Sequence, residues 1–182
     1  MAPAQSVCER VQQLGMRKAL VVHSCGLDEL TPLGPADVVE LAPGGGLREY
    51  SLDPADLGVP RCEAADLAGG GPATNAAILR DAFGGARGAV TDALNLNAGY
   101  ALAACEVASS PQEGFAMAQE AQRSGAAARV MAAWVETSQA ALQQEQEQEK
   151  RTGVNASGAN GVAVSVPPAA PAGAKPSQPV DA

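Results

Sequence analysis

Asp28 and Glu29 form the only adjacent acidic pair in the first half of this 182-residue sequence. They lie in a loop marked by Gly26 and ending at Pro35, directly after a short apolar run. In open α/β sheets, ligands bind beyond the carboxyl ends of the strands, so chemistry is expected in this loop. An acidic pair in a loop is more commonly plain solvated surface, and both interpretations stay open at this point.

Short strands must position this loop. The run Ala19–Val22 has the length and β-branched content of a buried strand. Two further strands are expected at Val38–Leu41 and Leu47–Leu52, joined by the turn Pro43–Gly46 into a hairpin. The predicted fold class is therefore α/β, with a short sheet that contains a hairpin and is covered by helices.

Helices are expected before and after these strands in the sequence, and the residues that start and stop them are clear. Ser6 and Glu9 fit a capping box, and so do Ser110 and Glu113 with a proline between them. Glycines supply the stops. The expected helical segments are 6–14, a brief turn at 53–57 before Gly58, 72–83, about 87–107, 110–123, and a last helix running towards Leu142. In that last helix Val130, Met131, Trp134 and Val135 are expected to face the core.

The composition changes after residue 142. Gln143–Glu149 is polar on every side, and from Thr152 onwards the chain consists largely of Gly, Ala, Ser and Pro. Such a segment buries too little apolar area to offset the entropy lost on ordering. The sequence therefore predicts one domain over residues 1–142 and a disordered low-complexity tail over residues 143–182.

Charge and cysteine content exclude several classes of protein. Twelve basic and twenty acidic residues give a net charge of −8, so neither nucleic acid nor an anionic membrane is an expected partner. No apolar run approaches the length of a membrane span. Four widely spaced cysteines without a C-x-x-C motif indicate free thiols in a reducing compartment. No targeting peptide is recognisable at the start of the sequence.

Several motifs in order resemble one enzyme family. They are Gly-Leu-Asp-Glu at 26–29, Asp-Pro-x-Asp-x-Gly at 53–58, Asn-Ala-x-x-Leu-Arg-Asp at 75–81, Leu-Asn-Ala at 96–98 and Ser-Gly at 124–125. Together they resemble the C-terminal half of anthranilate phosphoribosyltransferases (glycosyltransferase family 3), in the plant and algal style. The resemblance covers roughly Val7 to Ser138. It implies part of the α/β domain that these enzymes share with nucleoside phosphorylases.

The resemblance implies a reaction, a cofactor and partners. The family transfers a 5-phosphoribosyl group from phosphoribosyl pyrophosphate to anthranilate in tryptophan biosynthesis. Its Asp-Glu pair binds Mg²⁺ and maps onto Asp28 and Glu29, which an irregular loop allows to face one ion. The intact enzyme is expected to be a homodimer through an N-terminal helical domain, and a plant-type enzyme is expected in the plastid stroma.

The sequence also departs from the family pattern. Gly71 stands where the family usually has Asp, and Ser24 where many members have Gly. The family's phosphate-binding Gly-Thr-Gly-Gly-Asp loop and its Lys-His-Gly-Asn segment belong to the N-terminal half, and neither occurs in these 182 residues. This chain alone is therefore expected to be inactive, and no catalytic or substrate-binding residue is assigned.

Other reactive residue types have plainer interpretations. His23 is expected to be a hydrogen-bonded structural histidine, and Cys25 a plain thiol because no partnered base is visible. Gly69–Gly71 is expected to be a flexible linker into a helix, since the Lys-Ser/Thr of a phosphate-binding loop does not follow.

Three functions stay open. The first is the C-terminal portion of an anthranilate phosphoribosyltransferase, which predicts a missing strand neighbour and uncovered apolar surface. The second is a non-catalytic remnant that acts as a binding or regulatory module. The third is a relative of the pyrimidine nucleoside phosphorylases, against which the Gly-Leu-Asp-Glu loop argues.

Overall fold

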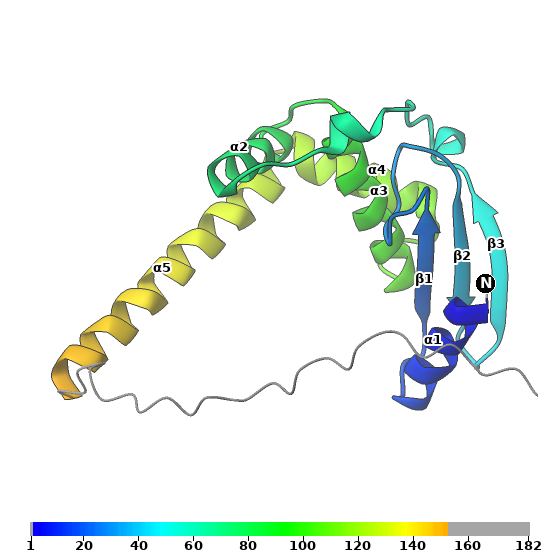
Figure 1. Ribbon diagram of the computed structural model, residues 1–182, viewed down its shortest axis with the longest axis horizontal. Coiled ribbons are helices and arrows are strands. Elements are labelled where there is room, and N and C mark those ends of the chain that lie inside the picture. Colours follow the sequence, from blue (N-terminus) through cyan, green and yellow to red (C-terminus); the bar gives the residue numbers. More distant parts are fainter. Residues whose placement is uncertain (1, 153–182) are drawn as a thin grey trace, which may run out of the picture. The chain divides into compact units, whose positions relative to one another are not determined.

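The computed structural model describes residues 2–152, so most of the predicted tail, residues 153–182, lies outside the described residues. Along the chain, α1 precedes three consecutive strands, and the remaining helices follow them (Figure 1). The elements are α1 (Ala2–Gln13), β1 (Ala19–Ser24), β2 (Ala36–Leu41), β3 (Leu47–Leu52), the 3₁₀ turns η1 (Pro54–Leu57) and η2 (Ala64–Leu67), α2 (Pro72–Phe83), α3 (Ala89–Ala104), α4 (Pro111–Arg123) and α5 (Ala126–Thr152).

The three strands form one antiparallel sheet in the order β1-β2-β3. The hairpin between β2 and β3 is confirmed, and the Ala42 N–H donates to the Gly46 carbonyl across its turn. The expectation that β1 is an interior strand is wrong within the described residues, because β1 pairs with β2 on one side and its residues 19–22 are half-buried. The strand-end rule for parallel sheets therefore does not by itself place a site here.

Each face of the sheet is covered by a different helical layer. On one face the Cys8 thiol of α1 is fully buried and lies 3.5 Å from the carbonyl oxygen of Val39. On the other face α3 and α4 contribute Leu96 and Phe115 to the core. The other members of this buried cluster are Leu30, Ala36 and Val59, with Val22, Leu52, Leu57 and Tyr100 packed around it.

The packing of α3 on α4 depends on two glycines. A Cβ added to Gly99 would lie 2.7 Å from the Cα of Phe115. A Cβ added to Gly114 would lie 2.9 Å from the carbonyl carbon of Gly99. The two backbones therefore touch, which is possible only where neither helix carries a side chain.

Most helix boundaries follow the sequence signals. Asp53 caps η1 by accepting from the Ala55 N–H at 2.8 Å, and Gly58 ends the turn with a left-handed φ of 76°. Ser110 caps α4 by accepting from the Glu113 N–H at 3.2 Å. The capping box expected at Ser6 is wrong, because α1 begins at Ala2 and a proline is tolerated in its first turn.

The last helix differs most from expectation. The sequence predicts Val130 and Trp134 to face inward, but their relative exposures are 70% and 68%. The helix also continues to Thr152, so the disorder expected from Gln143 is wrong up to that residue. Gln, Glu, Lys and Arg are good helix formers and can extend a helix through solvent. The described chain divides into two units after Thr137, so α5 belongs to both.

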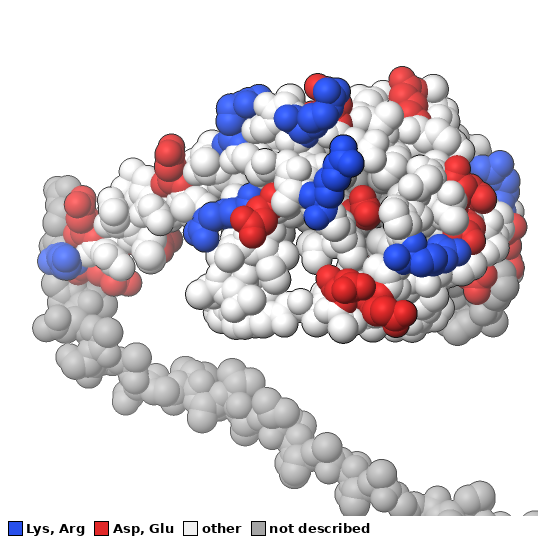
Figure 2. All heavy atoms as spheres, turned by 90° about the horizontal axis from the view of Figure 1, so that it is seen from above, with Lys and Arg blue, Asp and Glu red and all other residues white. Residues whose placement is uncertain are grey.

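Basic and acidic side chains are interspersed on the face of the molecule drawn in Figure 2. Among the described residues, no helix is both long enough and apolar enough to cross a membrane.

Candidate functional site

A tight turn at the end of β1 begins the loop that carries the acidic pair. Ser24 and Leu27 exchange two backbone hydrogen bonds of 2.9 Å, and the residues between them both have positive φ, 52° at Cys25 and 88° at Gly26. Two consecutive positive φ values define a type I′ turn, which reverses a strand most tightly. Glycine suits the second position because it has no Cβ. The turn therefore brings Asp28 back alongside the end of β1.

The far side of the loop is fastened to α3. Asn97 accepts from the Leu30 N–H at 3.0 Å and donates to the Leu30 carbonyl at 2.8 Å. Its amide also donates to the Ala93 carbonyl one turn earlier, at 2.9 Å, which fixes its rotamer. Leu30 itself is 1% exposed. A side chain that satisfies both backbone groups of a buried residue holds that residue as a strand partner would.

A second fastening lies beside the first. The Ser24 and Thr31 hydroxyls are fully buried and lie 3.1 Å apart. The loop is therefore fixed at both ends, at the turn after β1 and at Leu30–Thr31. The segment free to meet a ligand is the pair between these anchors, Asp28 and Glu29.

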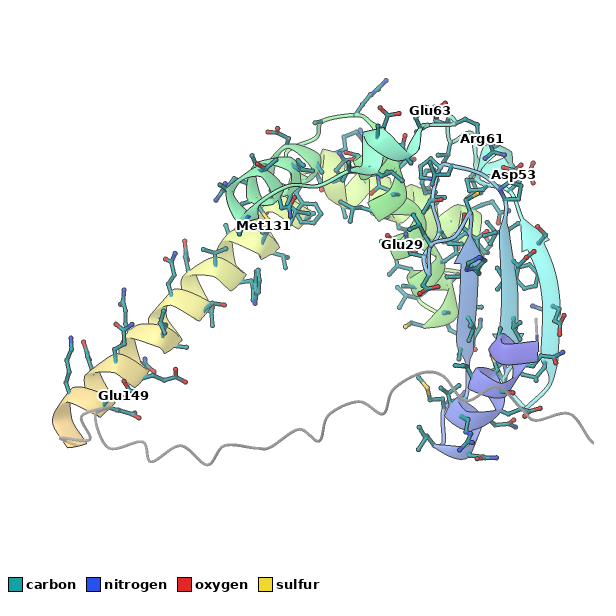
Figure 3. The ribbon with its side chains drawn as sticks, viewed as in Figure 1. Glu29, Asp53, Arg61, Glu63, Met131 and Glu149 are labelled. Carbon is teal, nitrogen blue, oxygen red and sulfur yellow. The ribbon has the colours of Figure 1, made fainter. Side chains whose placement is uncertain are left out.

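The two acids are exposed and lie in different surroundings. The Asp28 side chain is fully exposed, and its Oδ1 lies 3.7 Å from Nδ1 of His23. Asp28 and His23 line a groove of about 370 Å³ between α1 and the sheet, together with Val7, Val21 and Asp37. Glu29 does not line this groove; it lies on the part of the loop that turns back beside β1 (Figure 3). The His23 side chain is 60% exposed.

Asp28 and Glu29 could supply only part of the coordination shell of a Mg²⁺ ion. Within residues 2–152 no three His, Cys, Asp or Glu side chains are close enough together to hold a metal ion. Mg²⁺ is often bound through one or two carboxylates, with water and substrate phosphates completing its coordination. Asp28 and Glu29 match that use, because both are exposed oxygen donors on a fixed loop.

Two other family-like motifs organise the chain next to the sheet. Asp53 binds Arg61 through a 2.6 Å ion pair, and this contact, with the Ala55 N–H, lowers the pKa of the Asp53 carboxyl. Figure 3 shows the pair on the segment that follows β3. Asn75 accepts from the Gly70 N–H at 2.7 Å and donates to its carbonyl at 2.9 Å. The glycine run leads into α2 as expected, but Asn75 holds the Gly70 backbone, so this residue is not part of a flexible linker as the sequence predicts.

Asn97 is the site residue that sequence reasoning did not single out. It belongs to the Leu-Asn-Ala motif, but no role follows from its sequence neighbours because its partner is 67 residues away. The available signal was two amides, Asn95 and Asn97, in a largely apolar stretch of helix, where a buried amide needs a hydrogen-bond partner.

Comparisons with known proteins agree with these motifs. The model of the glycosyl transferase family a/b domain matches residues 2–128. The chain belongs to this family. The anthranilate phosphoribosyltransferase of Moorella thermoacetica is 43% identical over 137 residues, which are 73% of this chain and 40% of that protein. Anthranilate phosphoribosyltransferase 2 of Streptomyces coelicolor is 40% identical over 135 residues, 74% of this chain and 40% of that protein.

Solved structures of the family share the fold described above. The anthranilate phosphoribosyltransferase of Thermus thermophilus superposes with a TM-score of 0.66 at 37% identity, over 72% of this chain and 39% of that one. The Saccharomyces cerevisiae enzyme in complex with PRPP and Mg gives a TM-score of 0.54 at 26% identity, over 60% of this chain and 32% of that one. The chain thus spans about 40% of the length of the curated relatives it matches.

Proposed function

We propose that this chain is the C-terminal portion of an anthranilate phosphoribosyltransferase, which transfers a 5-phosphoribosyl group from phosphoribosyl pyrophosphate to anthranilate. The similarity to enzymes of that name over 137 residues carries the proposal. The fixed, exposed Asp28–Glu29 loop supports it, because it offers the hard oxygen donors that such a transfer needs. A related yeast structure contains PRPP and Mg, and another contains 4-fluoroanthranilate.

In this proposal the chain holds one side of the reaction site. Asp28 and Glu29 would bind Mg²⁺, which supplies charge neutralisation for a departing diphosphate. The two anchors of the loop would keep both carboxylates in place without further reorganisation, and such preorganisation is where electrostatic stabilisation comes from. No general base for the anthranilate amine is assigned to this chain. The phosphate-binding Gly-Thr-Gly-Gly-Asp loop that the resemblance implies would come from the N-terminal half of the enzyme.

A chimera tests the proposal. Residues 2–138 would replace the matched segment of the Moorella thermoacetica enzyme, and consumption of anthranilate and release of pyrophosphate would be measured with phosphoribosyl pyrophosphate and Mg²⁺. We expect turnover. The double substitution Asp28→Asn, Glu29→Gln should lower kcat/KM at least about 100-fold, because metal-held charge is worth roughly several kcal/mol in such transfers.

The matched control is Asp81→Asn, Glu106→Gln, which removes the same charge from two exposed acids outside the loop. It should leave turnover within about twofold of the parent chimera. A folded chimera without turnover would contradict the proposed activity. Full turnover by the Asp28→Asn, Glu29→Gln chimera would contradict only the metal-binding role.

The same chimera distinguishes the alternatives. Phosphorolysis of thymidine, with no use of anthranilate, would favour a pyrimidine nucleoside phosphorylase. Absence of both activities, with tight binding of another protein, would favour a non-catalytic module. Plant or algal affinity, a plastid location and a homodimer of the intact enzyme stay predictions from the resemblance.

A further inference from the structure

A cleft of about 520 Å³ lies beside the start of β1, at the opposite end of that strand from the carboxylate loop. Its lining comes from the sheet face that α3 and α4 cover, and from the segment that joins these two helices. Neither Asp28 nor Glu29 lines it, and the proposed transfer uses none of its side chains. Its volume is within the range of small-molecule sites.

The sheet supplies a buried acid and its cation to this cleft. Glu40 of β2 is only 7% exposed, and its Oε2 lies 2.6 Å from Nη2 of Arg48, its cross-strand neighbour on β3. The Arg48 side chain is 67% exposed, so it extends from the buried carboxylate towards solvent. A buried carboxylate is costly unless a cation and hydrogen-bond donors hold it. Arg48 is therefore fixed at one end and keeps further N–H groups for an incoming acceptor.

Both tyrosines of the chain line the cleft. Tyr50 shares a face of β3 with Arg48, because side chains two residues apart on a strand point the same way, and Tyr100 comes from α3. Both are half-buried, and burial raises the pKa of each phenol, so both are neutral at neutral pH. Together with Leu20 and Pro111 they form a wall against which a planar ring can pack.

A second cation lines the cleft without an acidic partner. Lys18 donates from Nζ to the Ala103 carbonyl at 3.2 Å, and no carboxylate of residues 2–152 lies within ion-pair distance of it. An ammonium has three N–H donors, so Lys18 can bind a further acceptor. The charges that face the cleft are then Lys18 and Arg48 against Glu40, an excess of one cation.

The other polar groups at the cleft do not change this balance. Glu49 contributes to the wall, but its carboxylate accepts from Gln5 of α1, on the other face of the sheet. The start of α4 is already capped, because Ser110 accepts from the Glu113 N–H and the Glu113 carboxylate accepts from the Ser109 N–H at 2.7 Å. The helix terminus therefore contributes no further anion site.

We propose that this cleft binds a small aromatic carboxylate. The ring of the ligand packs against Tyr50 and Tyr100, and its carboxylate accepts hydrogen bonds from Lys18 and Arg48. A single negative charge on the ligand balances the excess cation, and a planar ring complements the aromatic wall. The site is separate from the carboxylate loop, and it rests neither on the proposed transfer nor on Mg²⁺.

Tyrosine signals report on this site directly, because the only two tyrosines of the sequence both line it. The full 182-residue chain would be labelled with carbon-13 in its tyrosine rings and titrated with benzoate, and Tyr50→Phe would assign the two NMR signals. We expect both signals to shift saturably with a Kd of about 1 mM or lower, which a ligand of this size can reach. Cyclohexanecarboxylate should bind about fivefold more weakly, because it has no aromatic ring. Benzylamine, which carries the opposite charge, should not bind.

Substitutions separate the cleft from the rest of the surface. Lys18→Met keeps a long side chain but removes the cation, and it should weaken benzoate binding at least about tenfold, because a hydrogen bond between charged groups is lost. Lys150→Met is the matched control on an exposed part of α5, and screening should keep its effect within about twofold. Ala104→Leu narrows the cleft and should also weaken binding, which keeps the test valid if Lys18→Met does not fold.

Several results would overturn the proposal. They are tyrosine signals that do not shift or do not saturate, equal effects of Lys18→Met and Lys150→Met, or binding of benzylamine as tight as that of benzoate. Tighter binding of phenylalanine than of benzoate would replace the carboxylate by a zwitterion as the ligand class. In the chimera, Lys18→Met should leave anthranilate consumption unchanged, and a loss would show that the cleft is not separate from the reaction site. A chimera without turnover would contradict the proposed activity alone, because benzoate binding is measured without it.

Discussion

The crossing of α3 and α4 and the outer edge of β1 lie within the same unit of the chain, yet they differ in how closely they are packed. At the crossing, Gly99 and Gly114 let two backbones meet with no space left between them. At β1, apolar side chains are half-buried and backbone groups face outwards. This chain therefore has a close-packed core on its helical side and a partly exposed strand at the edge of its sheet. The carboxylate loop connects the two, since Asn97 of α3 holds Leu30 while Asp28 stands beside β1.

The largest effect is expected at the helix crossing. Gly114→Ala should lower the free energy of unfolding by about 3 kcal/mol, because a methyl group there has no space and neither backbone can yield. Urea denaturation followed by circular dichroism measures it. Gly46→Ala is the matched control, since a Cβ at Gly46 meets nothing within 4 Å, and its effect should stay within about 0.5 kcal/mol. Equal effects of the two substitutions would show that the crossing is not close-packed.

The next effect is expected where the loop is fastened. Asn97→Ala should lower the free energy of unfolding by about 2 kcal/mol, because it leaves the buried backbone groups of Leu30 without partners. In the active chimera, Asn97→Ala should also raise the Mg²⁺ concentration needed for half-maximal activity. Asn75→Ala, which frees the exposed Gly70 backbone instead, should leave that concentration unchanged. A loss of stability with no change in Mg²⁺ dependence would restrict Asn97 to a structural role.

A smaller effect, visible only at high pH, is expected between the sheet and α3. Burial, and after it the charge of Glu40, raises the pKa of Tyr50 to about 12. Between pH 10 and about 12, Tyr50 is protonated in the folded chain but ionised in the unfolded chain. Its contribution to stability is therefore complete below pH 10 and is lost between pH 10 and 12. Tyr50→Phe should flatten the fall in unfolding free energy over that range. Tyr100→Phe should flatten it less, and an unchanged slope for Tyr50→Phe would contradict the burial of this phenol.

The smallest effect is expected on the uncovered face of α5. Trp134→Ala should change the free energy of unfolding by less than about 0.5 kcal/mol, because 68% of Trp134 is exposed. Phe115→Ala, at a position only 7% exposed, should cost about 3 kcal/mol or more in the same assay. A large loss for Trp134→Ala would mean that this face of α5 is covered after all.

Local signals in the sequence were sufficient for most element boundaries. The capping serine before α4 and the proline that begins it lie where expected. So do the Asp-Pro start and glycine stop of η1, and the glycine turn between β2 and β3. Each depends on hydrogen bonds or φ angles within a few residues, so neighbouring residues contain the necessary information. The candidate loop was likewise recognisable as an ordered motif, Gly-Leu-Asp-Glu.

By itself, then, the sequence determined the short elements, the position of the acidic pair and the family. Only the tertiary structure decided that β1 is an edge strand among the described residues, that Asn97 fastens the loop, and that Val130 and Trp134 are exposed. An apolar pattern states that a surface needs a partner, but it does not say whether the same chain supplies one. Long-range contacts such as that between Leu30 and Asn97 join residues whose separation along the chain gives no local signal.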